Sequence, residues 1–238
     1  DTLERCGLDV LQLDHEDAHG QYEVNFAHAD AMASADRVML FKLAAHALAE
    51  AHGVVFSMMP KPFAAQPGSG MHCHVSLWRG QADNARNVFI AHRPDGSLDP
   101  HTLLSPTGRQ FIAGVLAHAA ALTALAAPTV NSYRRLKVIP SITGTTWAPA
   151  HVAQGFNNRT ALVRTLSGRF EWRAPDASAN PYLMLAGLIA AGLDGIEREL
   201  DPGADCDDDL FELTLAQLTE RGIGLLPQSL EQAVSALE

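Results

Sequence analysis

The sequence lacks several features that would assign it to a broad class. Its three cysteines, Cys6, Cys73 and Cys206, are isolated, and no CxxC spacing occurs. This pattern argues against a disulfide framework and a cysteine-rich zinc site, and it favours a reducing, cytoplasmic compartment. The longest apolar stretch, residues 183–193, is about half the roughly 20 residues that a membrane-spanning helix needs. We therefore expect no membrane partner.

Basic residues are also scarce, because 17 Lys and Arg stand against 27 Asp and Glu, a formal net charge of -10 at pH 7. A broad basic surface for nucleic acid is not expected, and an anionic ligand would need a local group of arginines. The P-loop pattern GxxxxGK[ST] and the protein kinase signatures are absent. The first residue is not methionine, so we expect that an N-terminal part of the protein precedes this chain.

Hydrophobic residues make up 47% of the 238 positions, enough to bury a substantial core. Alternating patterns predict strands, and helical spacing between capping residues predicts helices, one of them a buried helix that begins at Asn180. Residues 129–150 are irregular, and so long a loop is often functional. The expected strands cover residues 8–15, 21–26, 53–59, 71–78, 151–166 and 168–174, and the expected helices cover residues 30–52, 105–127, 180–196 and 226–237.

Two histidines stand out in the segment GSGMHCHVSLW. Side chains alternate along a strand, so His72 and His74 share one face, and Ser76 joins them. The two imidazoles could simply make hydrogen bonds on a polar sheet surface. Alternatively, at least one of them binds a metal ion, which requires carboxylates nearby.

Three glutamates could supply those carboxylates. Glu16 and Glu23 flank the turn at Gly20, and Glu171 and Arg173 alternate onto one strand face. Mostly oxygen donors with one histidine suit Mg²⁺ or Mn²⁺ better than zinc. Each glutamate alone is more often a solvated strand residue, so only the combination favours a metal site.

Arginines form the second group of candidates. Arg135, Arg159, Arg164 and Arg173 lie among apolar residues, where burial is costly without anionic partners. Structural ion pairs are one explanation. The other is that these guanidinium groups bind carboxylate or phosphate oxygens, and divalent ions beside arginines are typical of phosphoryl transfer. A hydrolase built around the two histidines would leave the arginines unexplained.

Five motifs resemble, in order and in most of their spacing, the catalytic domain of glutamine synthetases. The resemblance covers essentially the whole chain and is greatest to the type III branch, which includes glutamate-methylamine ligases and related γ-glutamylamide synthetases. It implies that ATP phosphorylates the γ-carboxylate of glutamate and that ammonia or a small primary amine then displaces phosphate. The motifs are DHEDAHGQYEVNF, MPKPFAAQPGSGMHCHVSLW, PTVNSYRRL, NNRTALVR and RFEWRAPDASANPYLMLAGLIAAGLDGI.

The resemblance implies a metal and nucleotide role for one set of residues. Glu16 and Glu23 match ligands of one divalent ion, and His72 and Glu171 match ligands of another. A complete site would hold two or more ions, Mg²⁺ or Mn²⁺. The residues implied to contact ATP or its phosphates are His74, Ser76 and Arg164.

A second set is implied to bind substrate and to act in catalysis. Gly68 matches the glycine of the glutamate-binding turn, and Arg135 matches the arginine that receives the substrate carboxylate. Arg159 and Arg164 match arginines that bind glutamate or phosphate, and Arg173 matches the arginine after the metal-binding glutamate.

The chain departs from the family pattern at several places. Pro67 replaces the usual asparagine before the glycine turn, and no lysine follows LVRT to contact the nucleotide base. Trp147 stands where ammonia-using members have a glutamate. An indole offers an apolar or cation-π surface, so a small alkylamine could replace or accompany ammonia as the nitrogen donor. Alternatively, Trp147 only packs the longer loop.

The implied fold is α+β, with a curved, antiparallel-rich sheet and helices packed outside it. Residues 1–238 would form the C-terminal catalytic domain, and the family's N-terminal β-grasp domain and first part of the catalytic domain would lie outside them. A homo-oligomeric ring is expected for the complete protein. The alternative is a non-catalytic relative that keeps the fold for binding or assembly.

We expect residues 1–238 alone to have no ligase activity, because the resemblance places further metal ligands and a neighbouring subunit in the complete site. Phosphate release from ATP and glutamate in the presence of an amine measures this. Turnover by the isolated segment would contradict the expectation.

Overall fold

The computed structural model describes residues 2–81, 84–92, 95, 97, 104–137 and 147–238. Its N-terminal half contains α1 (Thr2–Arg5), β1 (Val10–His15), β2 (Tyr22–Phe26), α2 (Ala31–Ala51), β3 (Cys73–Val75), β4 (Trp78–Arg79), β5 (Arg86–Asn87), α3 (Pro106–Ala117) and α4 (Ala119–Ala126). The remainder contains α5 (Ser132–Arg135), β6 (His151–Val152), β7 (Gln154–Phe156), β8 (Val163–Leu166), β9 (Arg169–Trp172), α6 (Pro181–Glu197), α7 (Leu215–Glu220), β10 (Gly224–Leu225) and α8 (Leu230–Leu237).

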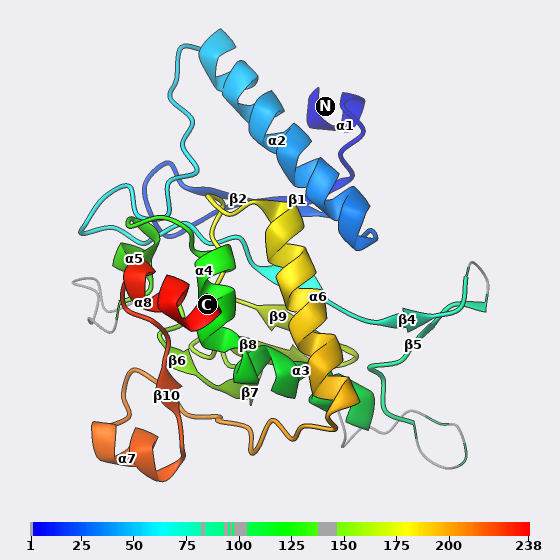
Figure 1. Ribbon diagram of the computed structural model, residues 1–238. Helices are drawn as coiled ribbons and strands as arrows, with labels where there is room; N and C mark the ends of the chain where they lie inside the picture. Colours follow the sequence, from blue (N-terminus) through cyan, green and yellow to red (C-terminus); the bar gives the residue numbers. More distant parts are fainter. Residues whose placement is uncertain (1, 82–83, 93–94, 96, 98–103, 138–146) are drawn as a thin grey trace.

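A four-stranded sheet in the order β3-β9-β8-β7 forms the centre (Figure 1). Its strands are antiparallel except for β7 and β8, which are parallel. The described strands are short, and three further two-stranded pairs surround this sheet. The expected α+β class with antiparallel-rich sheets is confirmed, and helices α3 and α6 lie beside the sheet.

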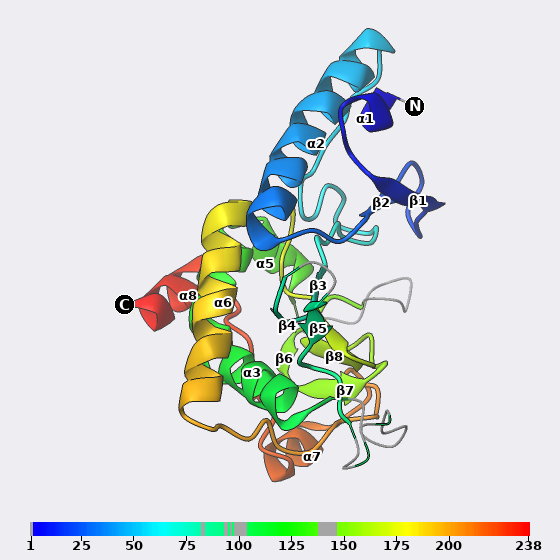
Figure 2. The same ribbon diagram turned by 90° about the vertical axis from the view of Figure 1, so that its right-hand side faces the viewer.

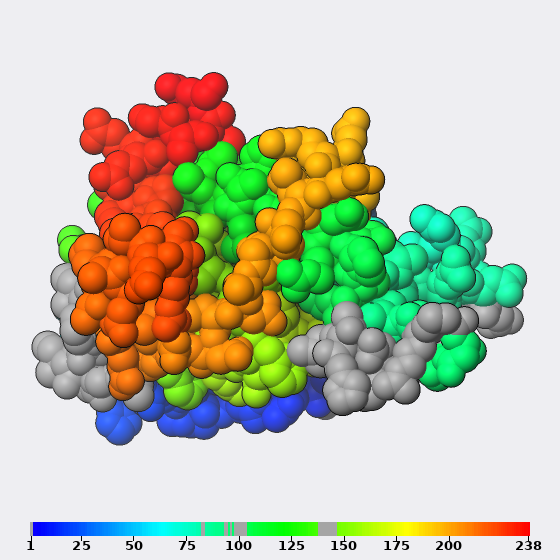
Figure 3. Space-filling view, turned by 90° about the horizontal axis from the view of Figure 1, so that it is seen from below, coloured from blue at the N-terminus to red at the C-terminus, as the bar shows by residue number. Residues whose placement is uncertain are grey.

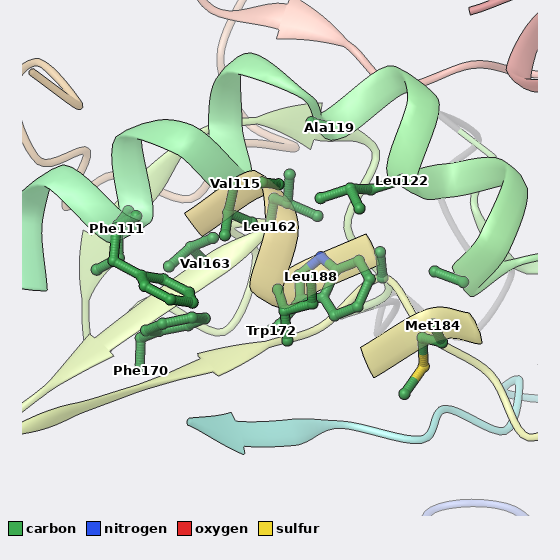
Figure 4. Close-up of a cluster of buried hydrophobic side chains, with 14 of the residues drawn as sticks. Phe111, Val115, Ala119, Leu122, Leu162, Val163, Phe170, Trp172, Met184 and Leu188 are labelled. Carbon is green, nitrogen blue, oxygen red and sulfur yellow. The ribbon is translucent and has the colours of Figure 1, made fainter. Parts of the chain in front are cut away.

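One face of this sheet builds the main core, shown in Figure 4. Phe170 and Trp172 of β9 are buried there, together with Phe111 of α3 and Leu188 of α6. The rings of Phe111 and Phe170 lie 5.8 Å apart between centroids. Because side chains alternate along β9, Glu171, which lies between Phe170 and Trp172, faces the opposite side of the sheet.

Helices α3 and α6 cross in very close contact through glycines. A Cβ atom added at Gly114 would lie 2.0 Å from the carbonyl oxygen of Ala191, and one added at Gly195 would lie 2.2 Å from that of Gln110. Both obstacles are backbone atoms of the facing helix, which a small side-chain movement does not displace. The glycines therefore set the distance between the two helices.

The N-terminal segment forms a layer at one end of the molecule (Figures 1 and 2). Strands β1 and β2 pair antiparallel around a turn in which Gly20 has a φ of 72°. The following helix α2 begins after Asp30, whose carboxylate accepts a hydrogen bond from the Ala33 amide, a helix cap. Both strands and this helix confirm the sequence predictions.

Other predictions were wrong or only partly correct. Residues 53–59, predicted as a strand, form none and leave Val55 95% exposed, because no described strand pairs with them. Helix α6 begins at its predicted Asn180 cap, but it is buried on one side only, with Leu183 59% exposed. The last helix, α8, starts at Leu230, four residues later than predicted, and α7 was not foreseen.

The predicted helix over residues 105–127 is two helices, α3 and α4, bent by 76° relative to each other. The break lies at His118, whose Nε2 is 2.8 Å from the Asp194 carboxylate of α6. Among the described residues, no single helix is long and apolar enough to cross a membrane, and only this bent pair meets that test when its members are combined.

The acidic segment after α6 runs over the surface as an extended strip, orange in Figure 3. The Cys206 amide donates to the carbonyl of Gln154 on β7. The side chain of Asn158 donates to the carbonyls of Cys206 and Asp208. These bonds tie the segment to the outer strand of the central sheet.

Replacing Gly114 with alanine should destabilise the fold by about 2 kcal/mol or more, because the added methyl group overlaps backbone atoms of α6. Intrinsic helix propensity alone would predict stabilisation instead. Urea unfolding monitored by circular dichroism measures the change. Gly187→Ala is the matched control, since its added methyl group meets the end of the Leu125 side chain, and equal effects of the two substitutions would contradict the explanation.

Candidate active site

Glu171 of β9 is the centre of a buried charge cluster on the face of the sheet opposite the core. Register places it between His74 of β3 and Arg164 of β8. Its Oε1 accepts from Arg173 at 2.7 Å and lies 3.1 Å from His72 Nδ1, and its Oε2 accepts from Arg164 at 3.1 Å. The side chain is only 4% exposed. One carboxylate therefore joins three strand segments and two arginines.

These contacts shift the protonation equilibria of the cluster. Burial alone would raise the pKa of Glu171, but the hydrogen bond from His72 and the charge of Arg173 outweigh it and hold this pKa far below its ordinary value. Burial lowers the pKa of His72, although Glu171 partly opposes this effect. Burial likewise lowers the pKa of Arg173. The carboxylate is therefore ionised, and its negative charge compensates the nearby guanidinium groups.

The contact with Glu171 also orients the His72 ring. When Nδ1 carries the proton and donates a hydrogen bond to Glu171, the other ring nitrogen, Nε2, has a free lone pair. Histidine ligands of metals commonly donate their other ring N–H to a carboxylate in this way. His72 is therefore held in a tautomer suited to binding a cation.

A second pair of carboxylates comes from the β1–β2 hairpin. Burial, a hydrogen bond shared with Glu16 and the charge of Glu16 raise the pKa of Glu23, and the charge of His72 opposes this shift. Glu23 also acts electrostatically on His74. The hairpin is attached to the body by Gln21, whose Nε2 donates to the Gly68 carbonyl at 3.0 Å. The predicted metal residues thus form two pairs, one on the hairpin and one on the sheet, and His72 of the second pair acts electrostatically on Glu23 of the first.

The donor atoms of these pairs fit a divalent cation in their chemistry. Two carboxylates in contact repel each other, and a hard cation such as Mg²⁺ or Mn²⁺ would relieve that repulsion. Among the described residues, however, no three His, Cys, Asp or Glu side chains form a preassembled group that could hold a metal. The two pairs are therefore separate from each other in this structure.

The predicted glycine turn lies directly on Arg135. A Cβ atom at Gly68 would lie 3.0 Å from Arg135 Cγ, and one at Gly70 would lie 2.6 Å from Arg135 Nη2. The guanidinium is buried and donates to the carbonyls of Arg173 and Ala174. Burial lowers the pKa of Arg135 to about 10. Two of the five N–H groups of Arg135 thus donate hydrogen bonds to backbone carbonyls.

The remaining predicted arginines border the same cluster. Asn157, which has a positive φ of 51°, accepts hydrogen bonds from Arg164. Trp147 is held by the bond from Arg173 Nη2 to its carbonyl, and the guanidinium of Arg159 lies 5.4 Å from its ring centroid. The Nε of Arg173 is buried and has no partner among the described groups. Residues 138–146 of the loop before Trp147 lie outside the described part.

Two of the three residues predicted to contact ATP or its phosphates, His74 and Ser76, occupy the edge of this face. His74 Nδ1 accepts a bond from Arg169 at 3.4 Å, and burial lowers the pKa of His74. The hydroxyl of Ser76 accepts from the indole of Trp78, which is 52% exposed. Cys73 and Val75, on either side of His74 in the sequence, pack against the core. The predicted division of this strand into two faces is therefore confirmed.

Sequence reasoning did not single out three residues that hold the site together. Gln21 and Asn157 are described above, and the third is Asn131, whose side chain bonds to the backbone of Lys61. A signal existed for Asn157, since asparagine tolerates a positive φ better than most residues. The contacts of the other two join distant segments and leave no local pattern.

Comparison with known proteins identifies relatives of the whole chain. Residues 1–238 match the family model described as "Glutamine synthetase, catalytic domain". The chain is 48% identical over 239 residues to a glutamate--methylamine ligase of Methyloversatilis universalis, covering 100% of this chain and 52% of that protein. It is 43% identical over 242 residues to a glutamine synthetase of Halobacterium salinarum, covering 100% of this chain and 50% of that protein.

Two solved structures are similar to this chain in both fold and sequence. A structure titled "GmaS/ADP complex-Conformation 1" superposes with a TM-score of 0.85 at 43% identity, covering 99% of this chain and 52% of that chain. A second, "Apo GmaS without ligand", gives a TM-score of 0.80 at 41% identity and covers 51% of that chain. The present chain spans about half the length of the relatives it matches.

Replacing Glu171 with glutamine should cost about 3 kcal/mol of folding stability near neutral pH, because buried guanidinium groups lose their counter-charge. The folded-state pKa of Glu171 is lowered, so the stabilisation is present above its ordinary value of 4.5 and is lost as the pH falls through the folded value. The difference in unfolding free energy between wild type and Glu171→Gln should therefore shrink as the pH falls below 4.5. Urea unfolding at several pH values measures this difference.

Asp201→Asn is the control for this comparison, since it breaks the exposed Arg109–Asp201 pair and should cost less than about 1 kcal/mol. Equal costs for the two substitutions, or a Glu171→Gln difference that grows on acidification, would contradict the buried-cluster account.

Proposed function

Because the chain belongs to the glutamine synthetase family and matches the model of its catalytic domain over residues 1–238, we propose that the protein ligates ammonia or a small primary amine to the γ-carboxylate of glutamate, with hydrolysis of ATP to ADP and phosphate. One observation carries this proposal. The Glu171 carboxylate binds two arginines and an oriented imidazole, and that imidazole acts electrostatically on Glu23 of the Glu16–Glu23 pair. The arrangement suits a reaction that brings several anionic oxygens together.

In this reaction the γ-carboxylate oxygen of glutamate attacks the γ-phosphorus of ATP, ADP leaves, and γ-glutamyl phosphate forms. The amine nitrogen then attacks the acyl carbon, phosphate leaves, and the nitrogen loses a proton. Most of the catalytic demand is electrostatic, since negative charge gathers among ATP, the carboxylate and the leaving phosphate. Fixed guanidinium groups can offset that charge without transferring protons.

The site residues take distinct parts in this scheme. Glu16, Glu23, His72 and Glu171 would hold the divalent cations, which supply charge neutralisation when bound. Gly68 and Arg135 would receive the glutamate carboxylate. The residues that would face the phosphate and acyl oxygens are Arg159, Arg164 and Arg173, and those that would contact the nucleotide are His74, Ser76 and Arg164.

Trp147 would border the site of the nitrogen donor. Trp147 is 51% exposed, the guanidinium of Arg159 lies 5.4 Å from its ring centroid, and Arg173 Nη2 donates to its backbone carbonyl. An aromatic face attracts an alkylammonium ion through its ring electrons and its apolar surface. We therefore propose a small alkylamine such as methylamine as a donor in addition to, or in place of, ammonia. A curated relative carries a methylamine ligase name.

Further features of the complete protein remain parts of this proposal. They include ATP with Mg²⁺ or Mn²⁺ as cofactors, a homo-oligomeric ring and a cytoplasmic location. Residues 1–238 would act as one catalytic-domain segment, together with parts of the protein that the longer relatives contain. A purely structural relative would have no use for the charge cluster, which favours the enzyme.

Phosphate release by the complete protein with ATP, glutamate and a panel of amines tests the function. We expect release that depends on glutamate, amine and a divalent ion. Trp147→Glu should shift the ratio of kcat/KM for methylamine to that for ammonia about tenfold toward ammonia, since a cation-π contact contributes about 0.5–2 kcal/mol. Trp147→Phe, which keeps an aromatic ring, should shift it far less.

Two outcomes would count against the proposal. A strong preference for ammonia in the unaltered protein would remove the amine assignment. Absence of phosphate release with every donor, while the protein is folded, would remove the ligase function.

A further inference from the structure

The loop over residues 60–69 leads into the glycine turn. Two side chains of helix α5 and its N-cap contact it: Asn131, at the N-cap, and Arg135, which lies under Gly68. Asn131 Oδ1 accepts from the Lys61 amide at 2.7 Å, and Asn131 Nδ2 donates to the Lys61 carbonyl at 3.0 Å. The two residues are 70 positions apart in sequence. One side-chain amide thus pairs with both polar groups of a single backbone residue, as a neighbouring strand would.

The Asn131 side chain is not used by its own helix. Asparagine often caps a helix with its side chain, but Asn131, at the N-cap position of α5, makes no such bond. Thr129 does so in its place, since its hydroxyl oxygen accepts from the Ser132 amide at 3.2 Å and contacts the Ser132 hydroxyl at 2.8 Å. The Asn131 amide is therefore free to bind the loop.

The loop itself is closed at its base. The Ser69 amide donates to the Pro60 carbonyl at 2.8 Å, and Lys61 Nζ donates across the loop to the Gln66 carbonyl at 2.6 Å. These bonds make residues 60–69 a compact unit whose position depends on how its base is attached. Figure 1 shows the loop beside α5.

Asn131 and Arg135 are four positions apart, one helical turn on α5. Asn131 bonds to Lys61, the second residue of the loop, and Arg135 supports Gly68 from beneath. On its other side, Gly68 accepts the bond from Gln21 of the hairpin that carries the glutamate pair. The attachment at Lys61 therefore influences where the glycine turn lies relative to the rest of the site.

We propose that Asn131 is a positioning residue, which holds the loop over residues 60–69 against α5 and so places Gly68 for the acyl substrate. The substrate part of this inference rests on the proposed function. It assigns to Asn131 a role in the affinity for glutamate, without direct contact to the reacting atoms.

Hydrogen–deuterium exchange of the complete protein tests the attachment without any need for activity. In Asn131→Ala, amides in residues 60–70 should exchange about tenfold faster, because two hydrogen bonds at the base of the loop are lost. Asn131→Asp should speed exchange less than alanine does, because its carboxylate can still accept from the Lys61 amide but cannot donate to the Lys61 carbonyl. Thr214→Ala, which removes the side-chain cap of α7, is the control, and it should leave this segment unchanged.

Steady-state kinetics test the positioning. Asn131→Ala should raise the KM for glutamate about tenfold, with the KM for ATP changed less than twofold. Unchanged exchange in residues 60–70, or equal changes in both KM values, would overturn the inference. If the unaltered protein releases no phosphate with any amine, the proposed function fails, and the exchange result alone decides whether Asn131 holds the loop.

Discussion

The contacts of the Glu171 carboxylate with Arg164, Arg173 and His72 are the interaction on which the rest of the site depends. A buried carboxylate or guanidinium is costly unless it is paired, so β3, β8 and β9 must meet in one register for any of these groups to be tolerated. The aromatic core on the other face supplies the stability that this arrangement needs. Packing on one face of the sheet thus supports concentrated charge on the other.

Much of this organisation could be predicted from the sequence, because it follows from local periodicity. Alternation separated the histidines from Cys73 and Val75, and the caps at Asp30 and Asn180 marked two helix starts. The bend at His118 could not be foreseen, because neither proline nor glycine marks it and the His118 side chain contacts Asp194, 76 positions away. The strand predicted for residues 53–59 does not form, because residues with high β-propensity make a strand only when a neighbouring strand pairs with them.

The candidate site shows the same limit. Glu23 pairs with Asp14 across a local hairpin and Glu16 lies two residues beyond Asp14 on the same face, so their spacing already indicated a pair. The contact between His72 and Glu171 joins segments far apart in sequence, and the family resemblance, not spacing, suggested it. Asn131 and Gln21 escaped notice because each bonds to backbone groups of a distant segment. Long-range contacts between a side chain and the backbone leave almost no trace in a single sequence.

The alternation along β9 limits how the length of this segment can change during evolution. Phe170 and Trp172 face the core, and Glu171 and Arg173 face the charge cluster. Insertion or deletion of one residue within the strand would exchange these two sets, placing charges in the core and aromatic rings on the charged face. Viable relatives should therefore differ in length at the bordering turn, around Gly168, and keep the strand itself free of single-residue gaps.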